Sequence, residues 1–356
     1  MIDSSSSLAL LEPEAVAWDS FVREHPQGNL LQQSGWGALK SRGGWQVRRL
    51  ALVGPQGIQA GAQVLIKRRL GLAGAYVPRG PLFSGDAATD QLLLTGLERL
   101  CKRNRAIFLR LEPNLLENAP EADALHTRLL LADFQAVDPL QPRTTVHLDL
   151  APAPERLLAA MSKGHRADIK RAARDGVAVR AGVGVGDLDA FYAIMQSTSV
   201  RAGFSIHSRD YYAAAFDIFR ASDDATLLLA EWQGAPVATA MVFADSHAGL
   251  YLYSGSTAEG LKCGAQHAIQ WQALQWARAT HCTSYDFWGV PDAFGQAALV
   301  SDEAERARLE EAATGDPLYG VYRFKKGFGG RVVRYLPAYD RVYIPTLYRV
   351  WKSRMG

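Results

Sequence analysis

The stretch "TLLLAEWQGAPVATAMVFAD" (residues 226–245) predicts two β-strands joined by a tight turn at QGAP. An earlier stretch, "QVRRLALVGPQGIQAGAQVLIKRR" (residues 46–69), has the same order of strand, turn and strand. Two matching pairs are each 177 positions apart, which is close to half of the 356-residue chain: Gly57 with Gly234, and Tyr76 with Tyr253. A pattern repeated at a fixed offset predicts two copies of one structural unit.

Both copies continue in the same way, with a further strand, an amphipathic helix and a final strand. The helix and the final strand cover residues 91–104 and 106–113 in the first copy, and 264–280 and 284–291 in the second. Helical patterns around residues 18–24 and 188–197 begin the two copies. This order predicts a tandem α+β protein with a cleft between its copies.

Composition and cysteine usage limit the class of protein. Apolar residues make up 48% and charged residues 21%, which is typical of a folded globular chain. Cys101, Cys263 and Cys282 have no CxxC spacing, so we expect reduced, buried thiols and no zinc site. No apolar run approaches the roughly 20 residues of a membrane-spanning helix, and the N-terminus lacks the basic region of a secretory signal. We therefore expect a cytoplasmic protein without a transmembrane segment.

Charge is unevenly distributed along the chain. The stretch from Arg323 to Arg354 contains nine Lys or Arg residues and one acid, whereas residues 292–316 contain seven acids and two arginines. A predicted helix that begins at Glu155 and stops at Gly176 carries cations near one face: Lys163, Arg166, Lys170 and Arg174. Its other side holds Ile169, Ala172 and Ala173. The basic face is either solvated surface or a site for phosphates or RNA.

Motifs spread over nearly the whole chain resemble the Fem-type aminoacyltransferases (FemX, FemA and FemB), which build the cross-bridges of bacterial peptidoglycan. The order and spacing of these motifs carry the resemblance: "QQSGWGALKSRGGW" (32–45), "YVPRGP" (76–81), "LRLEP" (109–113), "KGHRADIKRAARDGV" (163–177), "YLYSGS" (251–256), "AIQWQAL" (268–274), "YDFWGVP" (285–291) and "GVYRFKKGFGG" (320–330).

The resemblance implies two tandem GNAT-like (acetyltransferase-like) domains. Some family members carry a long helical arm in the second domain, and the chain lacks such a heptad-rich insertion. In members that resemble FemX, the last segment returns to complete the first domain. We therefore expect a first domain of residues 1–143 with 331–356, and a second domain of residues 144–330.

The implied function is transfer of an amino acid from aminoacyl-tRNA to an amine on the stem peptide of a peptidoglycan precursor, forming an interpeptide bridge. The acceptor is UDP-MurNAc-pentapeptide or the lipid-linked precursor, and the resemblance does not decide between them. No cofactor is expected. Peripheral contact with the inner membrane leaflet stays open.

Family analogy assigns the catalytic roles to Lys325 and Phe324 in "YRFKKGFGG". A fixed cation about 3 Å from the oxyanion of the tetrahedral intermediate would lower the barrier by a few kcal/mol. Phe324 would position the reactants. On an extended segment, Lys326 would face away from Lys325 and matter less.

Analogy also suggests residues that bind the substrates. Lys40, four residues after Trp36, matches a lysine that contacts phosphate. Glu112 stands where the family has a carboxylate near the incoming peptide, either as a general base or as a partner of the peptide's ammonium group. The family's second phosphate contact is an arginine in an R-x-x-x-Y pattern. Here His207 stands four residues before Tyr211, with Arg209 between them, so either Arg209 substitutes or the diphosphate is held more weakly. Tyr253, with Tyr251 on the same strand face, matches a tyrosine that contacts substrate.

Two other functions compete with this one. An acetyltransferase would need a loop that cradles the pyrophosphate of coenzyme A, and "RAGVGVG" from Arg180 has valine where the first glycine should fall. A non-catalytic module that binds RNA or precursor would keep the basic surfaces and lose turnover.

Overall fold

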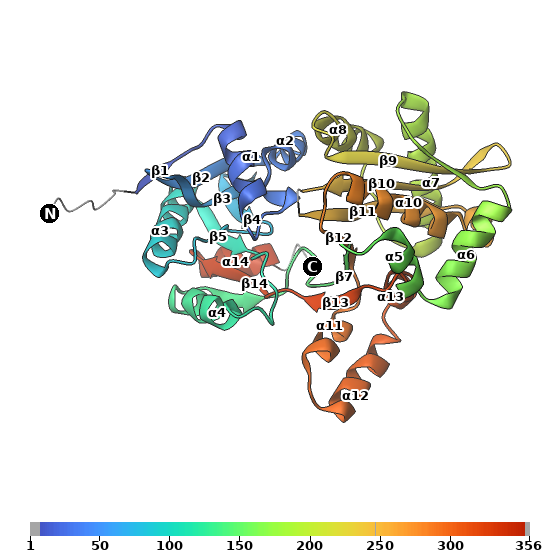
Figure 1. The fold of residues 1–356 in the computed structure, drawn as a ribbon. Coiled ribbons are helices and arrows are strands. Elements are labelled where there is room, and N and C mark those ends of the chain that lie inside the picture. The colour runs from blue at the N-terminus through green and yellow to red at the C-terminus, as the bar shows by residue number, and fades with distance from the viewer. Residues whose placement is uncertain (1–7, 246, 353–356) are drawn as a thin grey trace. The chain divides into compact units, whose positions relative to one another are not determined.

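The computed structural model describes residues 8–245 and 247–352 (Figure 1). The chain divides into two compact units, Met1–Arg143 with Arg334–Gly356 and Thr144–Val333, called here the first and the second unit. The N-terminal residues 1–7, used to judge a secretory signal, lie outside the described residues, as does Arg354 of the basic tail. Among the described residues, no helix combines the length and the apolar character needed to cross a membrane.

The first unit contains a seven-stranded sheet in the order β1-β2-β3-β4-β5-β14-β6. Its strands are β1 (Ala9–Leu11), β2 (Gln46–Gly54), β3 (Gly57–Arg69), β4 (Leu72–Val77), β5 (Ala106–Leu111), β6 (Gln135–Val137) and β14 (Ala338–Val342). Only β4 and β5 are parallel neighbours, because α3 (Ala87–Arg103) connects them as a crossover helix. Asp86 caps the N-terminus of α3 with its carboxylate, which accepts from the Thr89 N–H, and the helix buries Leu93 and Leu97.

The second unit repeats this plan in a sheet of order β13-β7-β12-β11-β10-β9-β8. Its strands are β7 (Thr144–Asp149), β8 (Ala178–Ala181), β9 (Ala225–Trp232), β10 (Ala235–Ala244), β11 (Ala248–Ser256), β12 (Ser284–Gly289) and β13 (Arg331–Arg334). Here β11 and β12 are parallel and are connected through α10 (Ala265–Ala279). The series β2–β5 thus recurs as β9–β12, which confirms the tandem α+β fold inferred from the 177-residue offset.

Each sheet is completed by a strand that follows the other copy in the sequence. Strand β14, from the end of the chain, pairs with β5, while β7, which follows the first copy, pairs with β12. Strand β13 still belongs to the second sheet, so the chain returns to the first unit about three residues later than the expected boundary at 330/331. The exchange covers an edge of each parallel strand pair that would otherwise be open.

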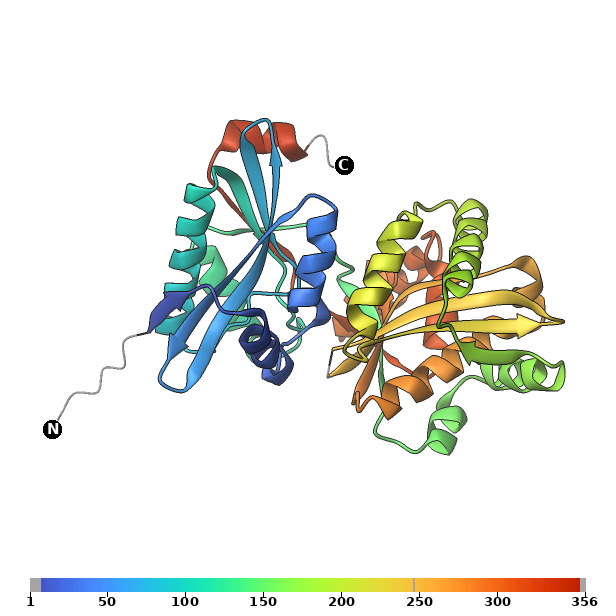
Figure 2. The same ribbon diagram turned by 90° about the horizontal axis from the view of Figure 1, so that it is seen from above.

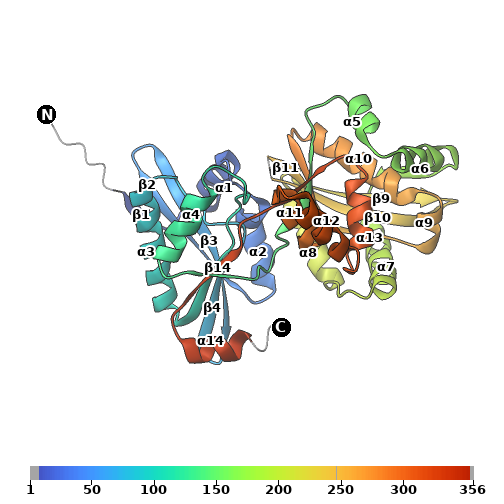
Figure 3. The same cartoon turned by 90° about the horizontal axis from the view of Figure 1, so that it is seen from below.

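Helices cover both faces of the second sheet, with α10 on one face and α7 (Val185–Ala202) and α8 (Arg209–Arg220) on the other (Figure 3). Within the described residues the longest helix is α7, with 18 residues, so they hold no long helical arm. The core between α10 and the sheet is apolar and includes Cys263 and Cys282, which are buried free thiols as expected, like Cys101 in the first unit.

The basic segment after β7 forms two helices instead of one. Helix α5 (Pro154–Ala160) ends before Ser162, whose hydroxyl accepts from the His165 N–H and starts α6 (Lys163–Arg174). Gly176, with φ +81°, follows the end of α6 as expected. Lys163, Lys170 and Arg174 are exposed and Ala172 is buried, whereas Ala173, expected on the apolar side, is exposed.

Candidate active site

Residues 322–326 of "YRFKKGFGG" are helical, and our expectation of an extended segment at Lys325 and Lys326 is wrong. Phe324 and Lys325 lie in the last turn of α13 (Tyr319–Lys326), and Gly327 follows the helix as its C-cap. Phe324 packs edge-on against the rings of Phe328 and His267, and this contact needs the spacing of a helix turn. A Cβ at Gly327 would lie 2.0 Å from the ring of His165, so only glycine allows this close approach.

The ammonium group of Lys325 is buried and held by backbone oxygens. The side chain is 7% exposed, and Nζ donates to the carbonyl oxygens of Gly289 at 2.8 Å and Trp288 at 3.1 Å. Trp288 has φ +64°, an unfavourable conformation for its side chain, and its N–H donates to Asp286 Oδ1 at 2.7 Å. Burial lowers the pKa of Lys325 to about 7, and the Asp286 carboxylate opposes part of that shift.

Lys325, Phe324 and Trp288 line a cavity of about 570 Å³. The remaining lining residues come mainly from the end of α7, the loop before α8, and β11, with others from α8, α9 (Ala258–Lys262), α10 and α13. All of them belong to the second unit. The volume of the cavity is typical of a site for a small molecule or for part of a larger substrate. A buried cation at its wall suits a reaction in which negative charge develops on bound substrate.

The altered R-x-x-x-Y region contributes a group of rings to this cavity. His207 lines the cavity and stacks on Tyr211, with ring centroids 3.9 Å apart. The hydroxyls of Tyr211 and Tyr253 are 3.5 Å apart, and burial together with Tyr211 raises the pKa of Tyr253. Arg209 is not part of the lining, because its Nε donates to Asp189 Oδ1 at 2.6 Å.

Tyr251 and Tyr253 lie on opposite faces of β11, and our expectation of a shared face is wrong. Tyr253 pairs with Met241 and Tyr251 with its neighbour Val242, so that Leu252 is the extra residue of a β-bulge. The ring of Tyr253 therefore meets Tyr212 of α8 at 5.0 Å, while the hydroxyl of Tyr251 accepts from Gln266 Nε2 of α10 at 2.8 Å. Tyr251, Gln266 and Tyr253 all line the cavity.

In the first unit, Lys40 and Trp36 lie one turn apart on α2 (Ser34–Arg42). Trp36 is 6% exposed, and Lys40 Nζ lies 4.5 Å from its ring centroid. This cation–π contact holds the ammonium group in one place over a buried ring. The pair thus presents a positioned point charge of the kind that phosphate sites use.

Glu112 is buried in the first unit and its carboxylate accepts several hydrogen bonds. Tyr76 donates its hydroxyl at 2.7 Å, and the backbone N–H groups of Leu140 and Gln141 donate as well. Burial raises the pKa of Glu112, and these donors oppose that shift. The carboxylate therefore connects the end of β5 to the 140–141 loop, which is a structural role whether or not it also meets a substrate.

Sequence reasoning did not single out His165 or the carbonyl of Trp288 as parts of this arrangement. The Nε2 atom of His165 lies 2.7 Å from the Phe324 carbonyl oxygen, and its ring packs against His267 at 4.6 Å. Burial lowers the pKa of both imidazoles, that of His267 to about 4. His165 and Trp288 lie in the motifs at 163–177 and 285–291, but those motifs assigned them no chemical role, so only the fold reveals their contacts with α13.

The fold defines a class, the tandem GNAT-like proteins. The crystal structure of FemX matches with a TM-score of 0.83 at 20% identity, over 96% of this chain and 99% of that one. A tandem GNAT protein from the clavulanic acid biosynthesis pathway matches with a TM-score of 0.54 at 11% identity, over 94% and 98% of the two chains. At these identities the likeness concerns the fold.

The family model of the FemAB family matches residues 14–233 and 232–353, and the chain belongs to that family. The Lipid II:glycine glycyltransferase of Staphylococcus saprophyticus is 24% identical over 94% of this chain and 93% of its own length. The UDP-N-acetylmuramoylpentapeptide-lysine N(6)-alanyltransferase of Weissella viridescens is 28% identical over 80% and 86%. Both relatives are aminoacyltransferases, and this confirms the enzyme class expected from the sequence.

Proposed function

We propose that this protein transfers an amino acid from aminoacyl-tRNA to an amine on the stem peptide of a peptidoglycan precursor. The observation that carries the proposal is the buried ammonium group of Lys325 at the wall of a cavity of about 570 Å³, in a member of the FemAB family. The names of the two relatives, a glycyltransferase and an alanyltransferase, support the reaction class.

In this reaction the acceptor nitrogen attacks the ester carbonyl carbon, and the carbonyl oxygen gains a negative charge. The carbon–oxygen bond to the tRNA ribose then breaks, an amide forms, and the proton lost by the amine goes to the ribose oxygen. An ammonium group has three N–H donors, of which Lys325 directs two to Gly289 and Trp288. The third N–H is left for the oxyanion. The hydrogen bond between them is strongest in a site from which water is excluded.

We propose separate precursor contacts within each unit. Lys40 supplies a point charge for its diphosphate, supported by the contact with Trp36. His207 and Tyr253 provide polar groups at the cavity of the second unit, where the family pattern has an arginine, and Tyr211 contacts both of them. Arg209 is engaged with Asp189, so we assign the altered position to His207 and not to Arg209.

The proposed donor is a polyanion, and the second unit offers exposed cations for it. Lys163, Lys170 and Arg174 are exposed on α6, and Arg323 is exposed beside Phe324 on α13. Cations on these two helices suit an RNA backbone. Because aminoacyl-tRNA is a cytoplasmic substrate, we place the proposed reaction in the cytoplasm.

The test is to incubate the purified chain with a mixture of charged tRNAs and with either UDP-MurNAc-pentapeptide or the lipid-linked precursor. We expect mass spectrometry to show a precursor heavier by one aminoacyl residue, and fragmentation to place it on a stem amine. Ribonuclease treatment of the tRNA should abolish the product. Acetylated precursor formed with acetyl-CoA, or binding of both substrates without any product, would overturn the proposal.

A further inference from the structure

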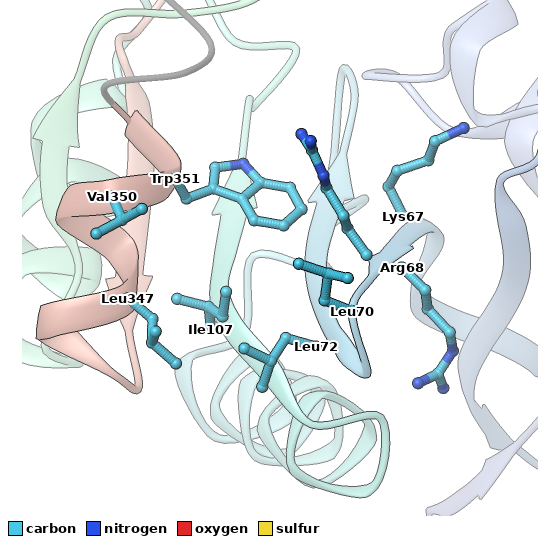
Figure 4. A pocket seen from close by; sticks show the side chains of 9 residues that line it. Lys67, Arg68, Leu70, Leu72, Ile107, Leu347, Val350 and Trp351 are labelled. Carbon is cyan, nitrogen blue, oxygen red and sulfur yellow. The ribbon is translucent and has the colours of Figure 1, made fainter.

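A second cavity, of about 340 Å³, lies in the first unit between the turn that joins β3 to β4 and the C-terminal helix α14 (Pro345–Lys352). Figure 2 shows this helix beside the blue hairpin of β3 and β4, and Figure 4 shows the cavity itself. Six of its lining side chains are apolar, and the other three are the cations Lys67, Arg68 and Arg69. Among the described residues, no carboxylate lines it.

Leu70, at the tip of the hairpin, is 90% exposed and is the most exposed large apolar side chain in the described part of the chain. Its φ of +51° and that of Gly71, +79°, form the tight turn that directs this leucine outward. An apolar side chain held out in water by a fixed turn, beside an open apolar cavity, indicates a surface that meets a partner.

Helix α14 offers a matching apolar stripe across the cavity. Tyr348 packs into the core with Ile107 and Phe108, and Leu347 and Trp351 pack against the same cluster while staying partly exposed. Leu347, Val350 and Trp351 are spaced i, i+3, i+4 and line the cavity, and Val350 is 49% exposed. Tryptophan and leucine on one helix face, with a cation such as Arg349 on another, are typical of helices that lie at a membrane interface.

We propose that the surface formed by Arg69, Leu70, Leu347, Val350 and Trp351 docks on a membrane leaflet that carries anionic phospholipids. The charge on this surface is complementary to such headgroups. Lys67 donates to the Gly43 carbonyl at 2.6 Å and Arg68 donates to Asn104, so both cations are engaged with segments outside the hairpin. Arg69 is exposed beside the hairpin tip. Cations near an anionic leaflet are attracted to it while apolar side chains enter the acyl region.

This inference rests on the proposed function, because a docked enzyme would meet a lipid-linked precursor at the leaflet. It also bears on the difference between the two relatives, one named for lipid II and the other for the UDP-linked precursor. Docking at the leaflet favours the lipid-linked acceptor for this chain.

The test is sedimentation of the full chain with vesicles of phosphatidylcholine alone and vesicles that also contain phosphatidylglycerol. We expect binding to the anionic vesicles that weakens as salt is raised. Leu70→Glu should weaken this binding by at least about tenfold, since it removes the inserted side chain and adds repulsion. Leu131→Glu is the matched control, because Leu131 is also an exposed leucine (82%) of the first unit and lies outside the cavity lining.

Equal binding by Leu70→Glu and the unchanged chain would overturn the proposal, and so would the absence of binding to anionic vesicles. A dimer in solution that Leu70→Glu dissociates, without vesicle binding, would assign the surface to a second copy instead. Transfer to UDP-MurNAc-pentapeptide should survive in Leu70→Glu while transfer to vesicle-embedded lipid-linked precursor falls. Vesicle binding without any transfer would contradict the proposed function and leave the docking surface in place.

Discussion

The ammonium group of Lys325 donates to the carbonyl oxygen of Gly289 at 2.8 Å, at the residue where β12 ends. Backbone carbonyl dipoles orient a cation and leave its net charge in place. A directly paired carboxylate would instead cancel that charge. The strained φ of +64° at Trp288 brings a second carbonyl to the same ammonium group. Backbone strain of this kind persists where the surrounding structure holds it, and it is concentrated at functional sites.

Replacing Lys325 by Met removes the cation and keeps most of the side-chain volume. We expect turnover to fall by at least about 100-fold, because one missing oxyanion donor has an effect of that size in other enzymes. Precursor affinity, measured by calorimetry, should change little. Lys326→Met is the matched control, since its Nζ donates to the Gly330 carbonyl at 2.6 Å and its side chain is exposed, and it should keep most of its turnover.

The same substitution should not destabilise the fold. The pKa of Lys325 is lowered from 10.5 to about 7, so between these values the unfolded chain binds more protons than the folded one. Stability of the unchanged protein should therefore rise with pH across this window, and the cost of burying the charge is fully present below pH 7. Urea unfolding at neutral pH should find Lys325→Met at least as stable, with the difference shrinking toward pH 10.5; a less stable variant would contradict the burial cost.

A lysine with a pKa of about 7 can act either as a cation or as a neutral base, and the pH dependence distinguishes these roles. Arginine keeps its charge at all accessible pH values, so Lys325→Arg serves as a reference in which the charge does not titrate. The ratio of kcat/KM between the unchanged enzyme and this variant should fall as pH rises through about 7, if the charged form is the active one. A ratio that rises over the same range would instead assign Lys325 as a general base.

Local pattern predicted much of this fold, and the errors fall where long-range contacts decide. The hairpins β2–β3 and β9–β10 follow from turn residues and apolar runs, which are local signals. The bulge at Leu252 puts Tyr251 and Tyr253 on opposite faces of β11. A prediction that assumes strict alternation along a strand cannot reveal such an extra residue. The short aromatic segment 319–326 fits a strand or a helix by composition, and its packing against Phe328 and His267 settles the matter.

The bulge makes Tyr253 and Tyr251 a natural pair for comparison. Tyr253→Phe removes the hydroxyl that lies 3.5 Å from that of Tyr211, and we expect weaker precursor binding with little change in stability. Tyr251→Phe leaves the Nε2 of Gln266 without its partner on the opposite face, and this should lower the free energy of unfolding by about 1–3 kcal/mol. Calorimetry and urea unfolding on both variants test this division, and the reverse pattern would show that the bulge does not separate the two roles.

Glu112 should act mainly through stability. Its carboxylate accepts from Tyr76 and from the Leu140 and Gln141 N–H groups, so Glu112→Ala leaves three donors unpaired in a buried place. We expect a loss of about 2–4 kcal/mol in the free energy of unfolding, measured by urea titration. Glu112→Gln retains one acceptor oxygen and should lose less. Full stability of Glu112→Ala combined with loss of turnover would instead favour a general base.

Lys40→Ala tests the proposed phosphate contact in the first unit. The ammonium group of Lys40 lies 4.5 Å from the ring centroid of Trp36, which holds it as a positioned charge, so its removal should raise the dissociation constant of the precursor by about tenfold. The turnover at saturating precursor should stay nearly unchanged, because the diphosphate is bound equally in the ground and transition states. Trp36→Leu should have a smaller effect in the same direction, since it keeps the ammonium charge of Lys40 and removes only the ring that positions this charge. An effect of Lys40→Ala confined to turnover would place this lysine at the chemistry and not at the phosphates.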